Sequence, residues 1–234
     1  MKITPQTITY IQNVVDAAKV LDIDSIIVEP DCVRGMDSNQ TVVILQKDGV
    51  PDLPFGSVGI NRIGVFYARL GVVKTQENFT IDAVSDDTGE FVRSLTLKAT
   101  GTKVDYRCAN PTTIKAPRQV NDTVLFKVDM TAETIVMLDK GYRSMGVEEV
   151  TIVSKADGVV FEFTDINGDV FSHKFADTVE FVTDETDNSL FAHRYPVKTL
   201  LAIFKGSEGS FMVGKKGILK TTLNGLDVFV LPKV

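Results

Sequence analysis

The chain has 234 residues, of which 44% are hydrophobic, so it can bury one large or two modest cores without support from disulfides or metals. It carries 25 Lys and Arg against 31 Asp and Glu, a net charge of −6, so a DNA-binding role requires that the cations gather on particular surfaces. The two cysteines, Cys32 and Cys108, lie far apart and outside any CxxC pattern, which argues against a disulfide framework and against a zinc site.

The N-terminal residues, MKITPQTITYIQ, lack the basic and then apolar pattern of a secretory signal. No apolar run along the chain approaches the length that crosses a bilayer. We therefore expect a cytoplasmic protein, which for a viral protein means the cytoplasm of the host cell.

The first half of the chain predicts two helices, each followed by strands. Residues 5–22 place apolar side chains three or four apart, which indicates an amphipathic helix opened by a proline. Residues 25–33 and 40–47 are rich in β-branched side chains and predict strands. Residues 60–70 fit a second short helix, and residues 79–108 predict an antiparallel meander. The apolar face of the second helix is predicted to hold Ile60, Ile63, Tyr67 and Leu70.

The second half repeats this order of elements. Residues 110–122 contain two prolines and few large apolar side chains, which is typical of a surface connector. Residues 131–146 predict an amphipathic helix with Thr131 as its N-cap. Strands follow as far as residue 183, then a short helix over 196–207 and closing hairpin strands. Two helices and many strands in each half indicate an internal duplication.

We therefore predict an α+β protein built from two similar domains, each with antiparallel sheets and two helices. The N-terminal domain covers residues 1–109, the interdomain connector residues 110–122 and the C-terminal domain residues 123–234.

Three stretches of this sequence resemble the processivity-fold DNA sliding clamps. They are residues 25–45, residues 60–73 and the ending KGILKTTLNGLDVFVLPKV at residues 216–234. The chain is most similar to the trimeric clamps, which include those of tailed bacteriophages, the eukaryotic proliferating cell nuclear antigen and its archaeal counterparts; its short length and loose motifs favour the bacteriophage type. The resemblance implies a homotrimeric ring that encircles duplex DNA and tethers the replicative DNA polymerase, without enzymatic activity or a cofactor.

In such rings the helices line the hole, so their exposed faces should be basic. Several cations are spaced three or seven residues apart, which places each pair on one face of its helix. The first helix is weaker, because its Lys19 lies beside Asp16. The simpler alternative is that these charges are ordinary solvated faces. The predicted DNA-facing residues are Lys19, Arg62, Arg69, Lys140, Arg143, Lys198 and Lys205.

The resemblance also implies a groove beside the connector, into which the DNA polymerase and an ATP-dependent clamp loader insert a short apolar tail. An apolar anchor in such a pocket supplies most of the binding energy. For Met36, Ile44 and Phe229 singly, a place in the ordinary core is the simpler interpretation. The predicted groove residues are Met36, Ile44, Ile114, Phe229, Leu231, Pro232 and Val234.

Other chemistry is sparse in the sequence. The only two histidines, His173 and His193, form no metal-ligand motif. Residues 165–169 match the opening of an acidic calcium loop, but Val170 and Ala176 stand where its glycine and closing glutamate belong. We predict no metal, no cofactor and no nucleotide site, so a separate loader must supply any ATP that drives ring opening.

Two other classes of function share this composition. A strand-rich viral structural or assembly protein would also lack catalytic motifs, but it would not need basic pairs on its helices. An acid-base hydrolase that uses two carboxylates ranks third, because such pairs are recognised only in a folded structure. The mass of the protein in solution distinguishes a trimeric clamp from both.

Overall fold

The computed structural model describes residues 3–51, 53, 55–155, 158–175, 179–182, 191–205 and 209–233. The chain divides into two compact units. The first comprises Met1–Val120 with Asn224–Asp227, and the second comprises Asn121–Leu223 with Val228–Val234. Among the described residues, no helix is long and apolar enough to cross a bilayer.

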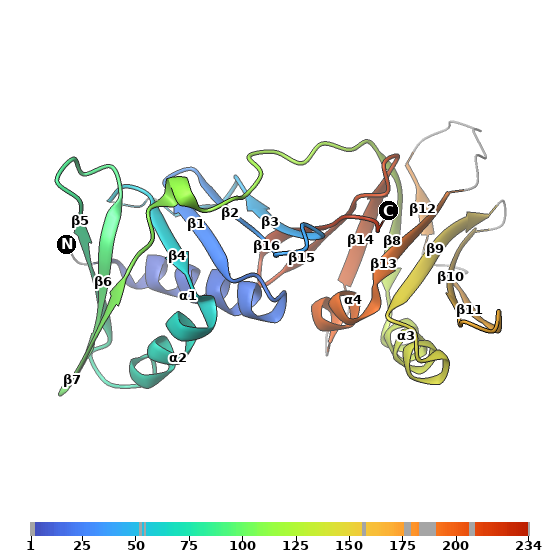
Figure 1. The fold of residues 1–234 in the computed structure, drawn as a ribbon, viewed down its shortest axis with the longest axis horizontal. Helices are drawn as coiled ribbons and strands as arrows, with labels where there is room; N and C mark the ends of the chain where they lie inside the picture. The colour runs from blue at the N-terminus through green and yellow to red at the C-terminus, as the bar shows by residue number, and fades with distance from the viewer. Residues whose placement is uncertain are drawn as a thin grey trace. The chain divides into compact units, whose positions relative to one another are not determined.

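The first unit is an α+β domain with two groups of antiparallel strands (Figure 1). Strands β3, β2, β1 and β4 lie side by side in that order, and β5, β6 and β7 form a separate sheet. Helices α1 and α2 pack against each other. The elements are α1 (Pro5–Val20), β1 (Ser25–Glu29), β2 (Cys32–Met36), β3 (Val42–Gln46), β4 (Val58–Asn61), α2 (Ile63–Val73), β5 (Thr80–Ser85), β6 (Val92–Ala99), β7 (Thr102–Arg107) and η1 (Pro111–Thr113).

The second unit has the same kind of architecture. Strands β11, β10, β9 and β13 form one antiparallel sheet, while β12, β8, β14 and β15 lie side by side in that order. Helices α3 and α4 pack against each other. The elements are β8 (Val124–Met130), α3 (Ala132–Met145), β9 (Glu149–Lys155), β10 (Gly158–Thr164), β11 (Val170–Phe175), β12 (Val179–Phe181), β13 (Ala192–Pro196), α4 (Val197–Phe204), β14 (Gly209–Gly214), β15 (Leu219–Leu223) and β16 (Leu226–Val230), which crosses the division between the units.

The start of the first helix is the same in both units, down to single hydrogen bonds. The Thr4 hydroxyl caps α1 by accepting from the backbone N–H of Thr7 at 3.2 Å, and Thr131 caps α3 by accepting from Thr134 at 3.2 Å. The two sequences, ITPQTI at residues 3–8 and MTAETI at 130–135, share this pattern. This residue-level match adds to the order of elements as a sign of duplication.

The junction before the second helix also repeats. The backbone N–H of Ile63 donates to the Asp24 carbonyl at 3.0 Å, and the N–H of Val197 donates to the Glu148 carbonyl at 3.0 Å. In both units the acceptor lies one residue before the strand next to the edge of its sheet, β1 or β9, and the donor begins the second helix. The two units are therefore built to one plan, as the order of elements predicts.

The second helix begins later than the sequence predicts. Residues 58–61 form β4, in which Ile60 pairs with Ile26 of β1, so the prediction of helix from residue 60 is wrong. The buried stripe of α2 consists of Ile63, Phe66, Leu70 and Val73. Tyr67 is 38% exposed at the margin of that stripe, because a helix that starts at Ile63 directs Phe66 rather than Tyr67 into the core.

The predicted strand over residues 25–33 is two strands, β1 and β2, joined by a turn at Pro30 and Asp31. Proline has no N–H for the ladder, so it ends β1. The second of these strands also extends beyond residue 33, where the predicted strand ends, because Arg34 lies in β2 and the following turn begins at Asp37.

Candidate functional site

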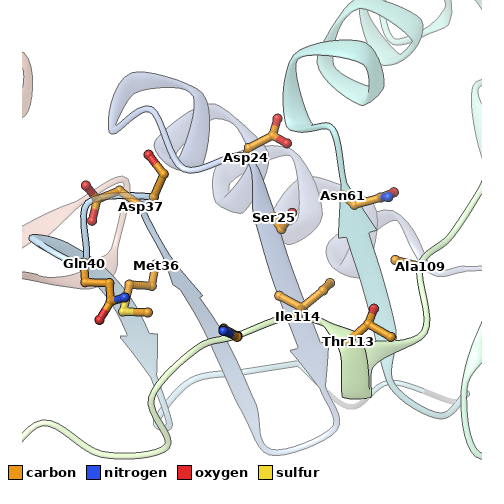
Figure 2. Close-up of a pocket in the computed structure, with 11 residues that line it drawn as sticks. Asp24, Ser25, Met36, Asp37, Gln40, Asn61, Ala109, Thr113 and Ile114 are labelled. Carbon is orange, nitrogen blue, oxygen red and sulfur yellow. The ribbon is translucent and has the colours of Figure 1, made fainter.

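A pocket of about 390 Å³ opens in the first unit, between the ends of β1, β2 and β4 and the segment that follows β7. Figure 2 shows Met36 at one end of this pocket and Ala109 at the other, with Ile114 between them. These apolar side chains are accompanied by polar ones, which include Asp24, Ser25, Asn61 and Thr113. Apolar walls with a few polar groups are typical of a site for a small ligand or a peptide side chain.

The turn after Met36 is held by a buried carboxylate. Asp37 is 8% exposed. Its side chain accepts from the backbone N–H groups of Thr41 and Val42 at 2.7 Å each, and from that of Asn39 at 3.2 Å. Because these bonds fix the turn, the wall of the pocket that carries Met36 is rigid, and the Asp37 carboxylate is already engaged.

The opposite wall depends on a glycine in β4. The N–H of Ala109 donates to the Gly59 carbonyl at 2.9 Å. A Cβ added to Gly59 would lie 2.5 Å from the Ala109 oxygen and 3.2 Å from Ile114 Cδ1. The chain after β7 therefore runs against β4 only because residue 59 has no side chain. The second unit has the matching bond, from the N–H of Lys233 to the Arg194 carbonyl at 2.9 Å.

A buried arginine fastens the rest of the segment. Arg34 is 8% exposed, and it donates from Nη1 to the Ala116 carbonyl at 3.0 Å. Its other nitrogens, Nε and Nη2, donate to both oxygens of Glu29, at 2.7 and 3.1 Å. These hydrogen bonds to Glu29 raise the pKa of Arg34, although burial opposes them. One charge-assisted cluster thus ties β2 to residues 114–116, which carry Ile114.

The structure brings together two of the predicted groove residues, Met36 and Ile114, in the pocket. Ile44 is fully buried in β3 and is absent from the pocket lining. The remaining predicted residues belong to the second unit, except that Val234 lies outside the described residues. Phe229 is 9% exposed in β16, and Leu231 and Pro232 are half-buried after it.

Sequence reasoning missed most of what builds the pocket. Asp24, Ser25, Asn61 and Thr113 line it, and Arg34 and Gly59 hold its connector wall. One feature was visible in advance, namely a charged residue, Arg34, inside the apolar run of residues 32–36. Such a residue in a buried strand requires partners.

In the second unit, all four predicted DNA-facing residues are exposed. Lys140 and Arg143 lie on α3, Lys198 lies on α4, and Lys205 is the C-cap residue of α4. Arg143 Nε lies 2.8 Å from the Asp139 carboxylate, and Lys198 Nζ lies 3.0 Å from Glu148. The bond from Lys198 lowers the pKa of Glu148. Lys140 and Lys205 make no ion pair with another of the residues that the structure describes.

In the first unit, Lys19 is exposed at the end of α1. Arg62 caps α2 in the left-handed conformation, with φ of 52°, and Arg69 is half-buried. Their guanidinium carbons lie 5.7 and 5.8 Å from the centroid of the Tyr106 ring in β7. Both arginines therefore face β7, on the same side of α2 as the buried Phe66, which forms an edge contact with Tyr106.

The helices and their cap residues carry more cations than anions, although the whole chain has a net charge of −6. The acidic residues are Asp16, Glu133 and Asp139, whereas the basic ones are Lys19, Arg62, Arg69, Lys74, Lys140, Arg143, Lys198 and Lys205. The cations are therefore concentrated on the helices of a chain that is acidic as a whole.

Within the described ranges, no cluster of three or more His, Cys, Asp or Glu side chains can hold a metal ion. Ala176, at the closing position of the possible calcium loop, lies outside those ranges. Burial raises the pKa of the Cys108 thiol to about 12 and raises that of Cys32. Both thiols are thus protonated at neutral pH and are poor nucleophiles.

No protein-family model and no curated protein matches the sequence. Among solved structures, the chain is similar to the PCNA of A. fulgidus, in a structure of the C-terminal region of FEN-1 bound to that protein. The match has 14% sequence identity, covers 96% of this chain and 95% of that chain, and has a TM-score of 0.66. The chain has a PCNA-like clamp fold. The sequence resemblance to sliding clamps implied two similar units with two helices each, and the structure has both features.

Proposed function

We propose that this protein is a DNA sliding clamp, which encircles duplex DNA, tethers a replicative DNA polymerase and catalyses no reaction. The observation that carries the proposal is a PCNA-like fold over nearly the whole chain, in which one α+β unit occurs twice. Three copies of a two-unit chain would place six units, with twelve helices, around one hole. A ring holds DNA by its topology, so it needs no tight contacts and no groups that recognise bases.

The cations on the helices supply the contact with DNA. Lys140, Arg143, Lys198 and Lys205 are exposed on the second unit. The ion pairs of Arg143 and Lys198 lie at the surface, where such pairs contribute only about 0–1 kcal/mol, so phosphates can replace the carboxylates. Weak phosphate contacts of this kind carry no sequence information and exchange readily, which permits sliding.

Ring closure requires a head-to-tail interface between two different surfaces of the chain. Two sheets end in strands that suit this interface, β7 in the first unit and β11 in the second. Among the described strands, β7 pairs only with β6 and β11 only with β10, and each has six residues. An open strand edge is a ready template for another strand. We propose that β7 of one copy pairs with β11 of the next.

The pocket of the first unit serves as the partner site. An apolar tail from the polymerase, the clamp loader or another replication protein would insert between Met36 and Ile114, and its backbone would meet polar groups such as Asn61 and Thr113. The PCNA of A. fulgidus, which shares this fold, binds the C-terminal region of FEN-1.

Two measurements test the proposal. Light scattering coupled to gel filtration should give a species of three times 25.7 kDa, the mass of one chain. Primer extension on primed circular DNA, with the cognate polymerase and loader, should then yield much longer products when the protein is added. A monomer or a heterogeneous assembly, together with unchanged product length, would refute the proposal.

A further inference from the structure

The open edge of β7 is already occupied at one position by a side chain of the same unit. The N–H of Cys108 donates to the Arg93 carbonyl at 2.9 Å. Two residues along each strand, Tyr106 of β7 lies opposite Leu95 of β6 in the same alignment. Backbone groups of a strand point alternately to its two sides. Tyr106 therefore faces β6 with its backbone groups, whereas the N–H and C=O of Asp105 point away from β6, towards the open edge.

Arg69 of α2 bonds to this outward carbonyl. Its Nη1 donates to the Asp105 oxygen at 3.1 Å. The guanidinium is held in place by the Tyr106 ring, whose centroid is 5.8 Å from its carbon, and the Tyr106 hydroxyl donates to the Asn61 carbonyl. The Asp105 carboxylate accepts from Thr96 at 2.7 Å. Both the arginine and the strand segment that it contacts are thus fixed.

We propose that Arg69 guards the β7 edge against strand pairing until a second copy of this chain displaces it. A strand that pairs along β7 needs the Asp105 carbonyl as an acceptor. The incoming strand therefore competes with Arg69 for the outward side of this oxygen. The inference rests on the proposed pairing of β7 with β11. Natural proteins protect open edges with charged side chains, and here the protection raises the protein concentration at which copies assemble.

The test compares two arginines that contact the same ring. Arg69→Met keeps the aliphatic stem but removes the donor. Arg62→Met is the matched control. The Arg62 guanidinium lies 5.7 Å from the centroid of the same Tyr106 ring, but Arg62 stands at the N-cap of α2, seven residues before the arginine that bonds to the Asp105 carbonyl. Sedimentation over a range of protein concentrations should show half-assembly of Arg69→Met at a concentration about tenfold lower than for wild type, since a charge-assisted bond no longer competes. Arg62→Met should assemble like wild type.

Hydrogen exchange at the Asp105 amide separates the two ways in which the inference can fail. This N–H points to the open edge, so assembly through β7 should slow its exchange. Assembly that leaves its exchange rate unchanged overturns the β7 interface, and with it the guard. The role of Arg69 alone is overturned if exchange at Asp105 slows on assembly but Arg69→Met assembles at the same concentration as wild type or at a higher one.

Discussion

The substitution Gly59→Ala tests how the segment after β7 forms the pocket wall. Its new Cβ would lie 2.5 Å from the backbone oxygen of Ala109, closer than real Cβ contacts allow, and 3.2 Å from Ile114 Cδ1. The close neighbour is backbone, so the segment after β7 must itself move. Overpacking of this kind costs about 1–3 kcal/mol, and loss of the bond from the Ala109 N–H adds about 1 kcal/mol. We expect the free energy of unfolding to fall by about 2–4 kcal/mol.

The matched control is Gly71→Ala. Gly71 lies in α2, and no atom lies within 4 Å of the Cβ that alanine would add. Alanine in a helix interior is favoured over glycine by about 0.8–1 kcal/mol, so this variant should be slightly more stable than wild type. Urea unfolding followed by circular dichroism gives both values, and hydrogen exchange at the Ala109 amide reports its bond to Gly59 directly. Wild-type stability and a protected Ala109 amide in Gly59→Ala would refute the reasoning.

Three further substitutions test other parts of the structure. Arg34→Met should cost about 2–3 kcal/mol in urea unfolding, because it leaves Glu29 and the Ala116 carbonyl without their partner; the double variant Glu29→Met/Arg34→Met should cost less, and a greater cost would contradict this account. Burial raises the pKa of Tyr106 from 10.0 to about 12, so the neutral phenol stabilises the fold fully below pH 10 and this contribution is lost as the pH rises towards 12. Tyr106→Phe should therefore flatten the decline of unfolding free energy over that range, and an unchanged slope would count against it. Thr131→Ala should cost about 1 kcal/mol through loss of the α3 cap, and Thr131→Ser should restore most of it.

The helices and the duplication were predictable because they depend on local pattern. An apolar period of three to four residues marks α1, α3 and α4, and Thr131 was predicted as a cap that the structure confirms. The start of α2 was not predictable in this way. Residues 58–61 are strand because Ile60 pairs with Ile26, thirty-four positions earlier in the chain, and no local pattern encodes that pairing.

The pocket was only partly predictable for the same reason. Met36 and Ile114 came from the resemblance to sliding clamps, and both line the pocket. The groups that shape it act over long separations in sequence, as Arg34 does on the Ala116 carbonyl and Gly59 does on Ala109. A single sequence shows that Arg34 is charged and that Gly59 is small, but it does not show which backbone approaches them.

The two units differ in the charge that they offer to DNA, although their folds match. The cations Arg62 and Arg69 of the first unit face Tyr106, and the exposed residues of α2 include Val65 at 39% and Val72 at 54%. Lys19, Arg62 and Lys74 are exposed in the first unit as well, but Arg62 and Lys74 lie 5.7 and 5.5 Å from the centroids of the Tyr106 and Tyr67 rings. The second unit exposes Lys140, Arg143, Lys198 and Lys205 on α3, on α4 and at the residue after α4. In the proposed ring, strong and weak contacts with phosphate would therefore alternate.

Charge reversal tests this asymmetry with two variants that change the net charge by the same amount. Lys140→Glu/Lys205→Glu removes two cations of α3 and the end of α4 that make no ion pair with another described residue, whereas Lys19→Glu/Arg62→Glu acts on the first unit. Removing one cation that binds a phosphate reduces the salt dependence of DNA binding by about one unit of log–log slope. We expect a greater loss of clamp-dependent DNA synthesis, and a greater fall in that slope, for the second-unit pair. Equal effects of the two pairs, with the assembled mass unchanged in both, would show that the units contribute alike and that strong and weak phosphate binding does not alternate around the ring.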